Sequence, residues 1–354
     1  MAVAEAVPAR AVLRPARLRL SLVGAAVFGL CVAGLAGVLV GAVRLSPGDV
    51  LVELIDRLPF VDVTSGLGER GAAILWQLRV PRVVLGGLVG AMLAMAGAAY
   101  QGAFRNPLAD PYLLGVAAGA GLGVTVAIAY IPRDTWPVDP LPIAAFAGGL
   151  IGVAGTYLLG RSAGRSRSTV SLILAGVAVA SFLTAAQTYV QQRNADTVQE
   201  VYVFILGTLA TVGWREVLLV LPYVAVSGIA LLLHRRLLDV MSLGDEEADA
   251  LGINATRVRL IIVLAATMGT AAAVAVSGLI AFVGIIVPHT IRLVWGTSYR
   301  LILPLSIAFG ATFLVGADLI ARTVLAPAEI PIGVVTAFFG APFFLIVLRR
   351  ARSM

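Results

Sequence analysis

Charge is scarce in this chain. Aspartate, glutamate, lysine and arginine make up only 13% of its 354 residues, whereas a soluble domain carries roughly 25%. Hydrophobic residues account for 60%, and the mean hydropathy is +0.98. These values exclude a soluble globular protein. The long charge-free stretches lack the alternation of membrane barrels, and they predict an all-α, multi-pass protein of the plasma (inner) membrane.

Reactive and metal-binding side chains are also few. The sequence has one cysteine, Cys31, and two distant histidines, His234 and His289. A single cysteine excludes a disulfide framework, and two separated histidines do not make a metal site. Phosphate-binding loops, nucleophile elbows and zinc-binding helix motifs are absent from the sequence. We therefore predict a non-catalytic chain without a cofactor or metal of its own, whose energy source lies elsewhere.

Lysine is absent, so all 26 basic residues are arginines. Most of them stop at the ends of apolar windows. That placement is typical of membrane topology and contact with anionic headgroups, and it argues against nucleic-acid binding despite the net charge of +7.

Nine charge-free windows are long enough to cross a bilayer, which takes about 20 residues of helix. The window 260–291 is too long for one crossing and contains Gly278, Gly284 and Pro288, so we expect a break there. One membrane-spanning domain, 20–350, follows a cytoplasmic, arginine-rich tail at 1–19. Its ten predicted spans are 20–43, 83–104, 112–131, 140–160, 168–192, 216–234, 259–277, 279–296, 300–322 and 331–348.

Arginine placement favours ten spans with both termini in the cytoplasm. This topology places 17 arginines inside and 9 outside, whereas a single crossing at 260–291 gives 13 on each side. Cytoplasmic loops carry the excess of positive charge in membrane proteins. Glycine and alanine are frequent in the spans, which lets helices approach closely and predicts a compact bundle.

The loop 235–257 is the longest predicted cytoplasmic connection. Asp245 is positioned to cap a short helix, with Glu246 and Glu247 in the first turn and Gly252 at the end. Two interpretations remain open: a solvated surface helix, or a docking helix for a soluble partner. The second is favoured by an apolar edge of Leu243, Ala248 and Leu251 on this acidic segment.

Ionisable residues at membrane depth are candidates for function because burying them is costly. Asp318 and Arg322 are four residues apart on one helix face and can pair locally. His289 is expected to be interfacial or a cap. Glu329, between two prolines, is expected to be an exposed loop acid.

Several motifs, in order along the chain, carry a family resemblance. They are Leu78-Arg79-Val80-Pro81-Arg82, Phe104-Arg105-Asn106-Pro107-Leu108-Ala109-Asp110-Pro111, Leu114-Gly115-Val116, Leu174-Ala175-Gly176-Val177, Leu243-Gly244-Asp245-Glu246, Phe282-Val283-Gly284, Val287-Pro288-His289 and Glu329-Ile330-Pro331-Ile332-Gly333. The sequence resembles the permease subunit of bacterial iron-siderophore, haem and cobalamin importers, the FecCD/BtuC-like branch of type II ABC importers.

This resemblance implies a homodimer of ten-span subunits, two ATPase subunits that hold ATP and Mg²⁺, and an extracytoplasmic substrate-binding protein. The cargo would be a large metal chelate, an iron-siderophore or haem, with cobalamin as the alternative within the family. A heterodimer with a paralogue also stays open. A secondary carrier and a haem-bearing electron-transfer subunit are disfavoured, because the spans have few buried acids and no paired axial ligands.

The resemblance also implies roles for particular residues. Docking of the binding protein would involve Arg79, Arg82 and Arg322, and the cytoplasmic gate Asn106, Leu108, Ser168 and Thr169. Helix capping is the alternative role for Ser168 and Thr169. Contact with the ATPase would involve Leu243, Gly244, Asp245, Glu246, Glu247, Ala248, Leu251 and Gly252. From their position, the path walls would include Gln187, Tyr189, Gln191, Tyr202 and Phe204.

Overall fold

The fold was analysed in a computed structural model, which describes residues 20–41, 43–57, 63, 65–132, 139–162, 169–210 and 213–351. In this part of the chain the secondary structure is entirely helical. The N-terminal half contains α1 (Leu20–Leu39), α2 (Pro47–Asp56), α3 (Glu69–Ala73), the π-helical turn η1 (Ile74–Arg79), α4 (Val80–Phe104), η2 (Pro111–Leu114), α5 (Val116–Tyr130) and α6 (Pro140–Ser162).

The C-terminal half continues with longer helices. It contains α7 (Thr169–Arg193), η4 (Ala195–Thr197), α8 (Val198–Leu206), α9 (Trp214–Met241), α10 (Asp245–Ala250), α11 (Ala255–Ser277), α12 (Val283–Trp295), α13 (Tyr299–Thr323) and α14 (Ile332–Ala351).

Apolar helices occupy all ten ranges in which the sequence predicts a span. Seven of the described helices are long and apolar enough to cross a membrane, and α5, α12 and α14 contain shorter apolar segments. The long window 260–291 is divided, because α11 ends at Ser277 and α12 begins at Val283. Gly278, directly after α11, has a φ of 68°, which a residue with a side chain rarely adopts.

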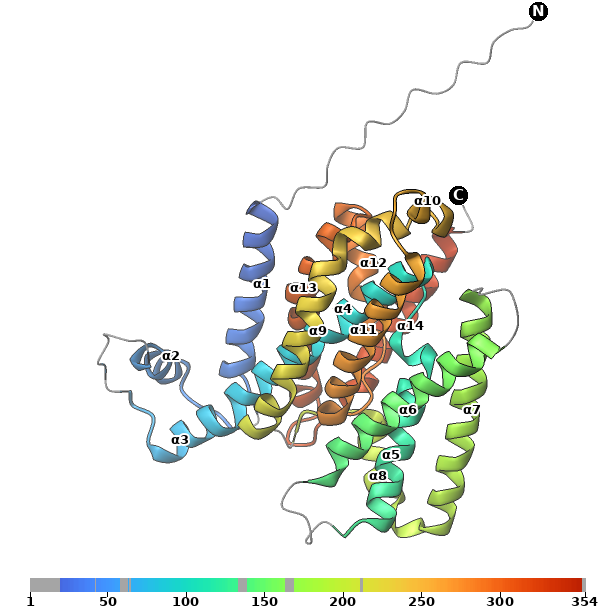
Figure 1. The fold of residues 1–354 in the computed structure, drawn as a ribbon. Coiled ribbons are helices and arrows are strands. Elements are labelled where there is room, and N and C mark those ends of the chain that lie inside the picture. The colour runs from blue at the N-terminus through green and yellow to red at the C-terminus, as the bar shows by residue number, and fades with distance from the viewer. Residues whose placement is uncertain are drawn as a thin grey trace, which may run out of the picture.

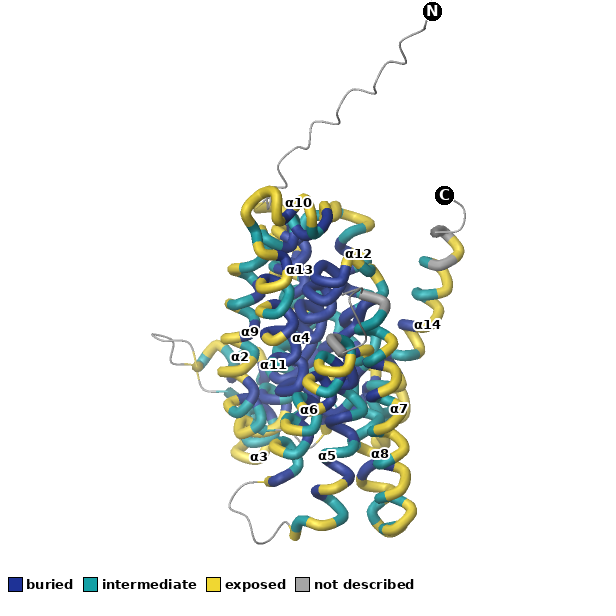
Figure 2. The backbone as a smooth tube through the Cα atoms, turned by 45° about the vertical axis from the view of Figure 1, so that its right-hand side comes forward, coloured by how far each residue is buried: buried dark blue, intermediate teal, exposed yellow. Residues whose placement is uncertain are grey.

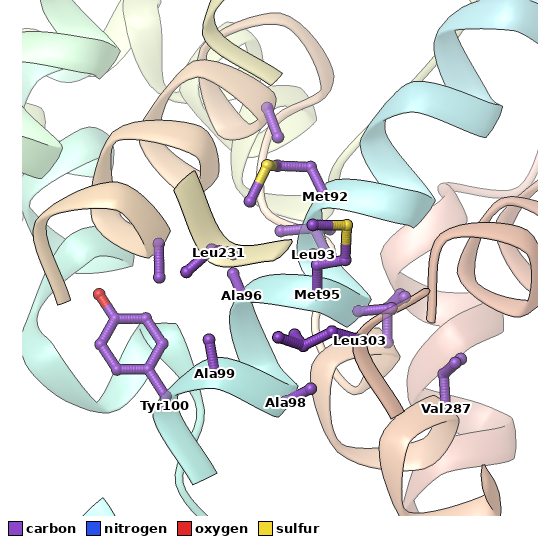
Figure 3. Close-up of a cluster of buried hydrophobic side chains, with 14 of the residues drawn as sticks. Met92, Leu93, Met95, Ala96, Ala98, Ala99, Tyr100, Leu231, Val287 and Leu303 are labelled. Carbon is purple, nitrogen blue, oxygen red and sulfur yellow. The ribbon is translucent and has the colours of Figure 1, made fainter. Parts of the chain in front are cut away.

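The centre of the bundle is formed by α4 and α11. In the helical stretch that ends with α4, 78% of the most apolar window is buried, and the value for α11 is 72%, against 17% for α7. Figure 2 shows this contrast between the buried centre and the exposed periphery. Figure 3 shows the side chains that α4 contributes to the core, with neighbours from α9, α12 and α13: Met92, Leu93, Met95, Ala96, Ala98, Ala99, Tyr100, Leu231, Val287 and Leu303.

Small residues set the distance between helices at two crossings. A Cβ atom added to Gly97 of α4 would lie 2.1 Å from the carbonyl oxygen of Gly284 in α12, and one added to Gly119 of α5 would lie 2.1 Å from that of Gly148 in α6. Neither position has room for a methyl group. Backbone contact of this kind is a common way to pack helices in lipid, where the hydrophobic effect does not drive helices together.

The bundle has two distinct ends. The start of α1, the end of α14 and the short helix α10 lie together at one of them, here named the α10 end (Figure 1). The last turn of α1 and the start of α4 lie at the other, near α2 and α3, here named the α2 end. Each end carries a cluster of charged side chains next to one end of α4.

Candidate functional site

At the α2 end, Arg82 joins three elements of the structure. Its Nη2 lies 2.8 Å from Asp318 Oδ1 in α13, and its Nε donates to both oxygens of the same carboxylate, at 3.0 and 3.1 Å. Nη1 and Nη2 also donate to the two oxygens of Glu329, each at 2.8 Å. Arg82 therefore ties α4 to α13 and to the loop that follows α13, with Asp318 buried and Glu329 exposed.

The local pair predicted from sequence, Asp318 with Arg322, is also present. Arg322 Nε lies 3.5 Å from Asp318 Oδ2, a longer contact than those of Arg82. Glu329 is exposed in the loop after α13, as predicted, and it also pairs with Arg82. The hydrogen bond from Arg82 lowers the pKa of Glu329, because it stabilises the charged carboxylate.

The other two arginines of this cluster hold the end of α1. Arg79 Nη1 donates to the carbonyl oxygens of Val38 and Leu39, each at 2.9 Å, and Arg322 Nη2 donates to that of Gly37 at 2.6 Å. These carbonyls belong to the last turn of α1, which lacks partners within the helix. Arg79 and Arg322 are buried, so among the three arginines assigned to docking only Arg82 has a partner at the surface, Glu329.

At the α10 end, α4 stops in a compact turn. Arg105 has a φ of 51°, and the amide of Asn106 donates back to the carbonyl of Gln101 at 3.1 Å. Asn106 Oδ1 accepts from the amide of Leu108 at 3.0 Å, and Asp110 Oδ1 accepts from that of Tyr112 at 2.9 Å. The predicted gate residues Asn106 and Leu108 thus belong to one turn, 105–110, whose shape is set by its own side chains.

The other half of the predicted gate is only partly described. Thr169 is the first residue of α7, and Ser168 lies outside the described residues. Their gating and capping roles stay predictions.

The predicted path residues on α7 lie in different environments. Gln187 is buried against α5, where a Cβ atom on Gly121 would lie 2.9 Å from its Oε1, so it presents little surface to a path. Tyr189 is exposed, with the Arg193 guanidinium carbon 5.6 Å from the centre of its ring. Gln191 is half buried. The position of α7 in the sequence did not reveal which of its faces is open.

The structure indicates further candidate path residues on α7. Ser181, Thr184 and Thr188 are exposed and follow each other at spacings of three and four residues, so they lie on one face. Two of them line a cavity of about 360 Å³ whose walls are Tyr112, Leu113, Gly176, Val177, Ala180, Ser181 and Thr184. On α8, Tyr202 is exposed and Phe204 is half buried. Hydroxyls at helical spacing in an apolar span were the sequence signal for this face.

The short helix α10 has two different sides. Leu243, just before it, and Leu251, just after it, are each 63% exposed, and Glu246 and Glu247 are exposed as well, whereas Ala248 is buried. The apolar edge predicted from sequence is therefore split between the surface and the bundle. The loop glycines lie on either side of the helix, Gly244 with a φ of 151° and Gly252 with a φ of 77°.

The predicted capping role of Asp245 is wrong. Asp245 is the first residue of α10, Gly244 occupies the cap position, and no side chain caps the helix there. The carboxylate instead pairs with Arg259 of α11 at 2.7 Å and with Arg105 at 3.5 Å. Two nearby arginines outcompete the backbone amides for this carboxylate.

No group of three or more His, Cys, Asp and Glu side chains in the described part of the chain is arranged to hold a metal ion. His289 packs edge-on against Phe343, with ring centres 5.8 Å apart. The charged side chains at both ends of α4 instead form contacts between helices.

The chain matches the FecCD transport family over residues 29–350. It belongs to that family. It is 40% identical to the cobalamin import system permease protein BtuC of Halobacterium salinarum, over 80% of this chain and 75% of that protein. It is 39% identical to the Fe(3+)-citrate import system permease protein YfmD of Bacillus subtilis, over 88% and 91% of the two chains.

A solved structure shows the same fold. A metal-chelate type ABC transporter in an inward-facing conformation matches with a TM-score of 0.80 and 27% identity, over 93% of this chain and 99% of that one. The predicted family is confirmed. This member of the FecCD transport family is thus a multi-pass inner-membrane permease of the ABC transporter class, a membrane component and not the catalytic one.

Proposed function

We propose that this permease moves a large metal chelate from an extracytoplasmic binding protein into the cytoplasm, driven by ATP hydrolysis on a separate subunit. The first cargo we propose is an iron-siderophore or haem, and cobalamin is the alternative. The names of the relatives support a chelate, because ferric citrate and cobalamin are both metals enclosed in an organic ligand.

We propose ten membrane crossings with both termini in the cytoplasm. Seven long and three shorter apolar helices support this number. The start of α1, the end of α14 and α10 lie at one end of the bundle (Figure 1), and the arginine excess predicted for cytoplasmic loops assigns that end to the cytoplasm.

The observation that carries the proposal is the outward side of α10. Leu243 and Leu251 expose apolar surface before and after the exposed acids Glu246 and Glu247, on a loop that we place in the cytoplasm. Exposed leucines framed by charge are typical of a docking surface for a soluble protein. We assign this surface to the ATPase subunit, one for each of two permease copies.

Cargo would enter at the α2 end. Binding-protein docking is assigned to the surface around Arg82 and Glu329, where a carboxylate of the partner would compete with Glu329 for the guanidinium. Arg79 and Arg322 are buried next to this surface and would stabilise it by fixing the end of α1.

The path is assigned to the α7 face that carries Ser181, Thr184 and Thr188, opposite the same face of the second permease copy. Hydroxyls contact a polar chelate weakly, which suits a path that cargo must leave as readily as it enters. The turn 105–110 directly precedes η2, whose residues Tyr112 and Leu113 line this cavity, and it would close the path on the cytoplasmic side.

The test is ATPase capture by the purified permease. Replacing Leu243 and Leu251 with alanine should weaken capture by about tenfold or more, because burial of each leucine contributes roughly 1.5–3 kcal/mol. Leu218→Ala is the matched control, since Leu218 is 65% exposed on α9 near the α2 end. Unchanged capture by the double variant would remove α10 as the docking surface.

Uptake by proteoliposomes tests the rest of the proposal. With ATPase and binding protein present, ferric siderophore, haem and cobalamin are each offered as cargo, and we expect ATP-dependent uptake of one of the first two. Uptake by the permease alone under a proton gradient would overturn the ATP-driven function.

A further inference from the structure

The inward side of α10 is linked to the end of α4 by one arginine of α11. Arg259 Nη2 donates to both oxygens of Asp245, at 2.7 and 3.0 Å. Its Nε donates to the carbonyl oxygen of Ala103, in the last turn of α4, at 2.9 Å. A single guanidinium group therefore contacts α10 and α4 at once, while its own backbone is fixed in α11.

A second contact joins the same groups. Arg105 Nη2 lies 3.5 Å from Asp245 Oδ1, so Asp245 is placed between two arginines. Arg105 directly follows α4, and its left-handed backbone directs the chain into the turn 105–110. Any displacement of Asp245 thus acts on both sides of the point where this turn leaves the helix.

The turn itself is stiff enough to move as a unit. Hydrogen bonds from the Asn106 amide to Gln101 and from the Leu108 amide to Asn106 Oδ1 fix its first residues to α4 and to each other. A pull at Arg105 or Ala103 would therefore be passed on to Leu108 and would not be absorbed by a flexible loop.

We propose that Arg259 is a positioning residue that couples movement of α10 to the turn 105–110. When the ATPase displaces α10, the link from Asp245 through Arg259 to Ala103, supported by Arg105, carries the displacement to the predicted gate. This inference rests on the proposed docking of the ATPase at α10. The Asp245 side chain is 42% exposed, and ion pairs at the surface contribute little to stability. These contacts therefore matter mainly for the positions in which they hold α10 and the end of α4.

Two variants and a control test this role in the reconstituted complex. Arg259→Gln removes both links, and Asp245→Asn weakens only the link to α10 while leaving the donation to Ala103. Arg257→Gln removes an exposed arginine from the same turn of α11. The measurement is the amount of cargo transported per ATP hydrolysed. If Arg259 only stabilised the fold, less protein would fold, but this ratio would stay the same for the molecules that do fold.

We expect both Arg259→Gln and Asp245→Asn to lower transport per ATP by about threefold or more, within the range of couplings between residues in one hydrogen-bonded network. The double variant should fall below Arg259→Gln only by the small contribution of the 3.5 Å contact between Arg105 and Asp245, and Arg257→Gln should match the wild type. Arg259→Lys should not restore the ratio, because lysine lacks the planar guanidinium group that reaches Ala103 and Asp245 at once.

Three results would count against the inference. An unchanged ratio in Arg259→Gln would overturn it. A lower ratio in Arg259→Gln together with a normal ratio in Asp245→Asn would mean that Arg259 acts only by capping the end of α4, through its hydrogen bond to Ala103. Failure of the wild-type chain to capture the ATPase would overturn the proposed function and, with it, this inference. If Arg259→Gln does not fold, Asp245→Asn decides by itself.

Discussion

The two ends of α4 are both bordered by arginine and aspartate side chains, but the two clusters differ in their exposure to solvent. At the α2 end, the side chains of Asp318 and Arg322 are 3% and 4% exposed. At the α10 end, those of Asp245 and Arg105 are 42% and 43% exposed. Buried pairs are costly to break one partner at a time, whereas exposed pairs contribute little to stability.

The difference indicates a division of tasks. The cluster at the α2 end fixes α1, α4 and α13 to one another through contacts that are buried at Arg79, Asp318 and Arg322. The cluster at the α10 end holds a surface helix next to a turn, with contacts that can be exchanged without unfolding the bundle. Substitutions at the α2 end should therefore mostly affect stability, and those at the α10 end mostly affect activity.

The largest effect is expected for Arg322→Glu. It would place two buried acids against each other and remove the donor to the Gly37 carbonyl. We expect a loss of about 3–5 kcal/mol of unfolding free energy, the usual cost of breaking a buried pair, seen as poor yield and early thermal unfolding in detergent. Arg257→Glu, an exposed charge reversal near the α10 end, is the control. Wild-type unfolding of Arg322→Glu would mean that the cluster does not hold the bundle.

A smaller and more local effect is expected for Arg79→Ala. The carbonyls of Val38 and Leu39 would lose their donor, at a cost of about 1–3 kcal/mol for a buried group left unsatisfied. Hydrogen exchange in the last turn of α1 should become faster, with little change in α4 or α11. Arg70→Ala, which removes an exposed arginine in α3, should leave this exchange as it is. Faster exchange throughout the bundle would contradict a local role.

These contacts show how far the sequence could lead. Helix positions followed from apolar windows, and the break near Gly278 from a window too long for one crossing. A local pair such as Asp318 with Arg322 was also within reach, because residues four apart share a helix face. The stronger partner of Asp318 is Arg82, which is 236 positions away in the sequence, and no periodicity reveals such a pairing.

The candidate site could also be predicted from the sequence only where its residues are close together in the chain. The turn 105–110 and the loop with α10 were found as motifs, since their residues are contiguous. Arg259 was missed because its importance depends on contacts with Ala103 and Asp245 from two other elements. The orientation of Gln187 was equally out of reach, because it is fixed by the space that Gly121 leaves on α5.

The smallest effect is expected for Glu329, where the α2-end cluster reaches the surface. Its pKa is lowered by the hydrogen bond from Arg82, so its contribution is present above the ordinary value of 4.5 and is lost as the pH falls below it, through the lowered pKa of the folded state. Glu329→Gln should therefore cost about 0–1 kcal/mol at pH 7, and this difference from the wild type should shrink as the pH falls through the lowered pKa of Glu329.

Thermal unfolding of both proteins across this pH range measures the difference, with Glu69→Gln, an exposed acid of α3, as the control for loss of a negative charge alone. A difference that does not change with pH would mean that Glu329 acts through packing and not through its charge. In that case Asp318 would be the acid whose charge holds Arg82, and the exposed charge pairs that act through their charge would be those at the α10 end.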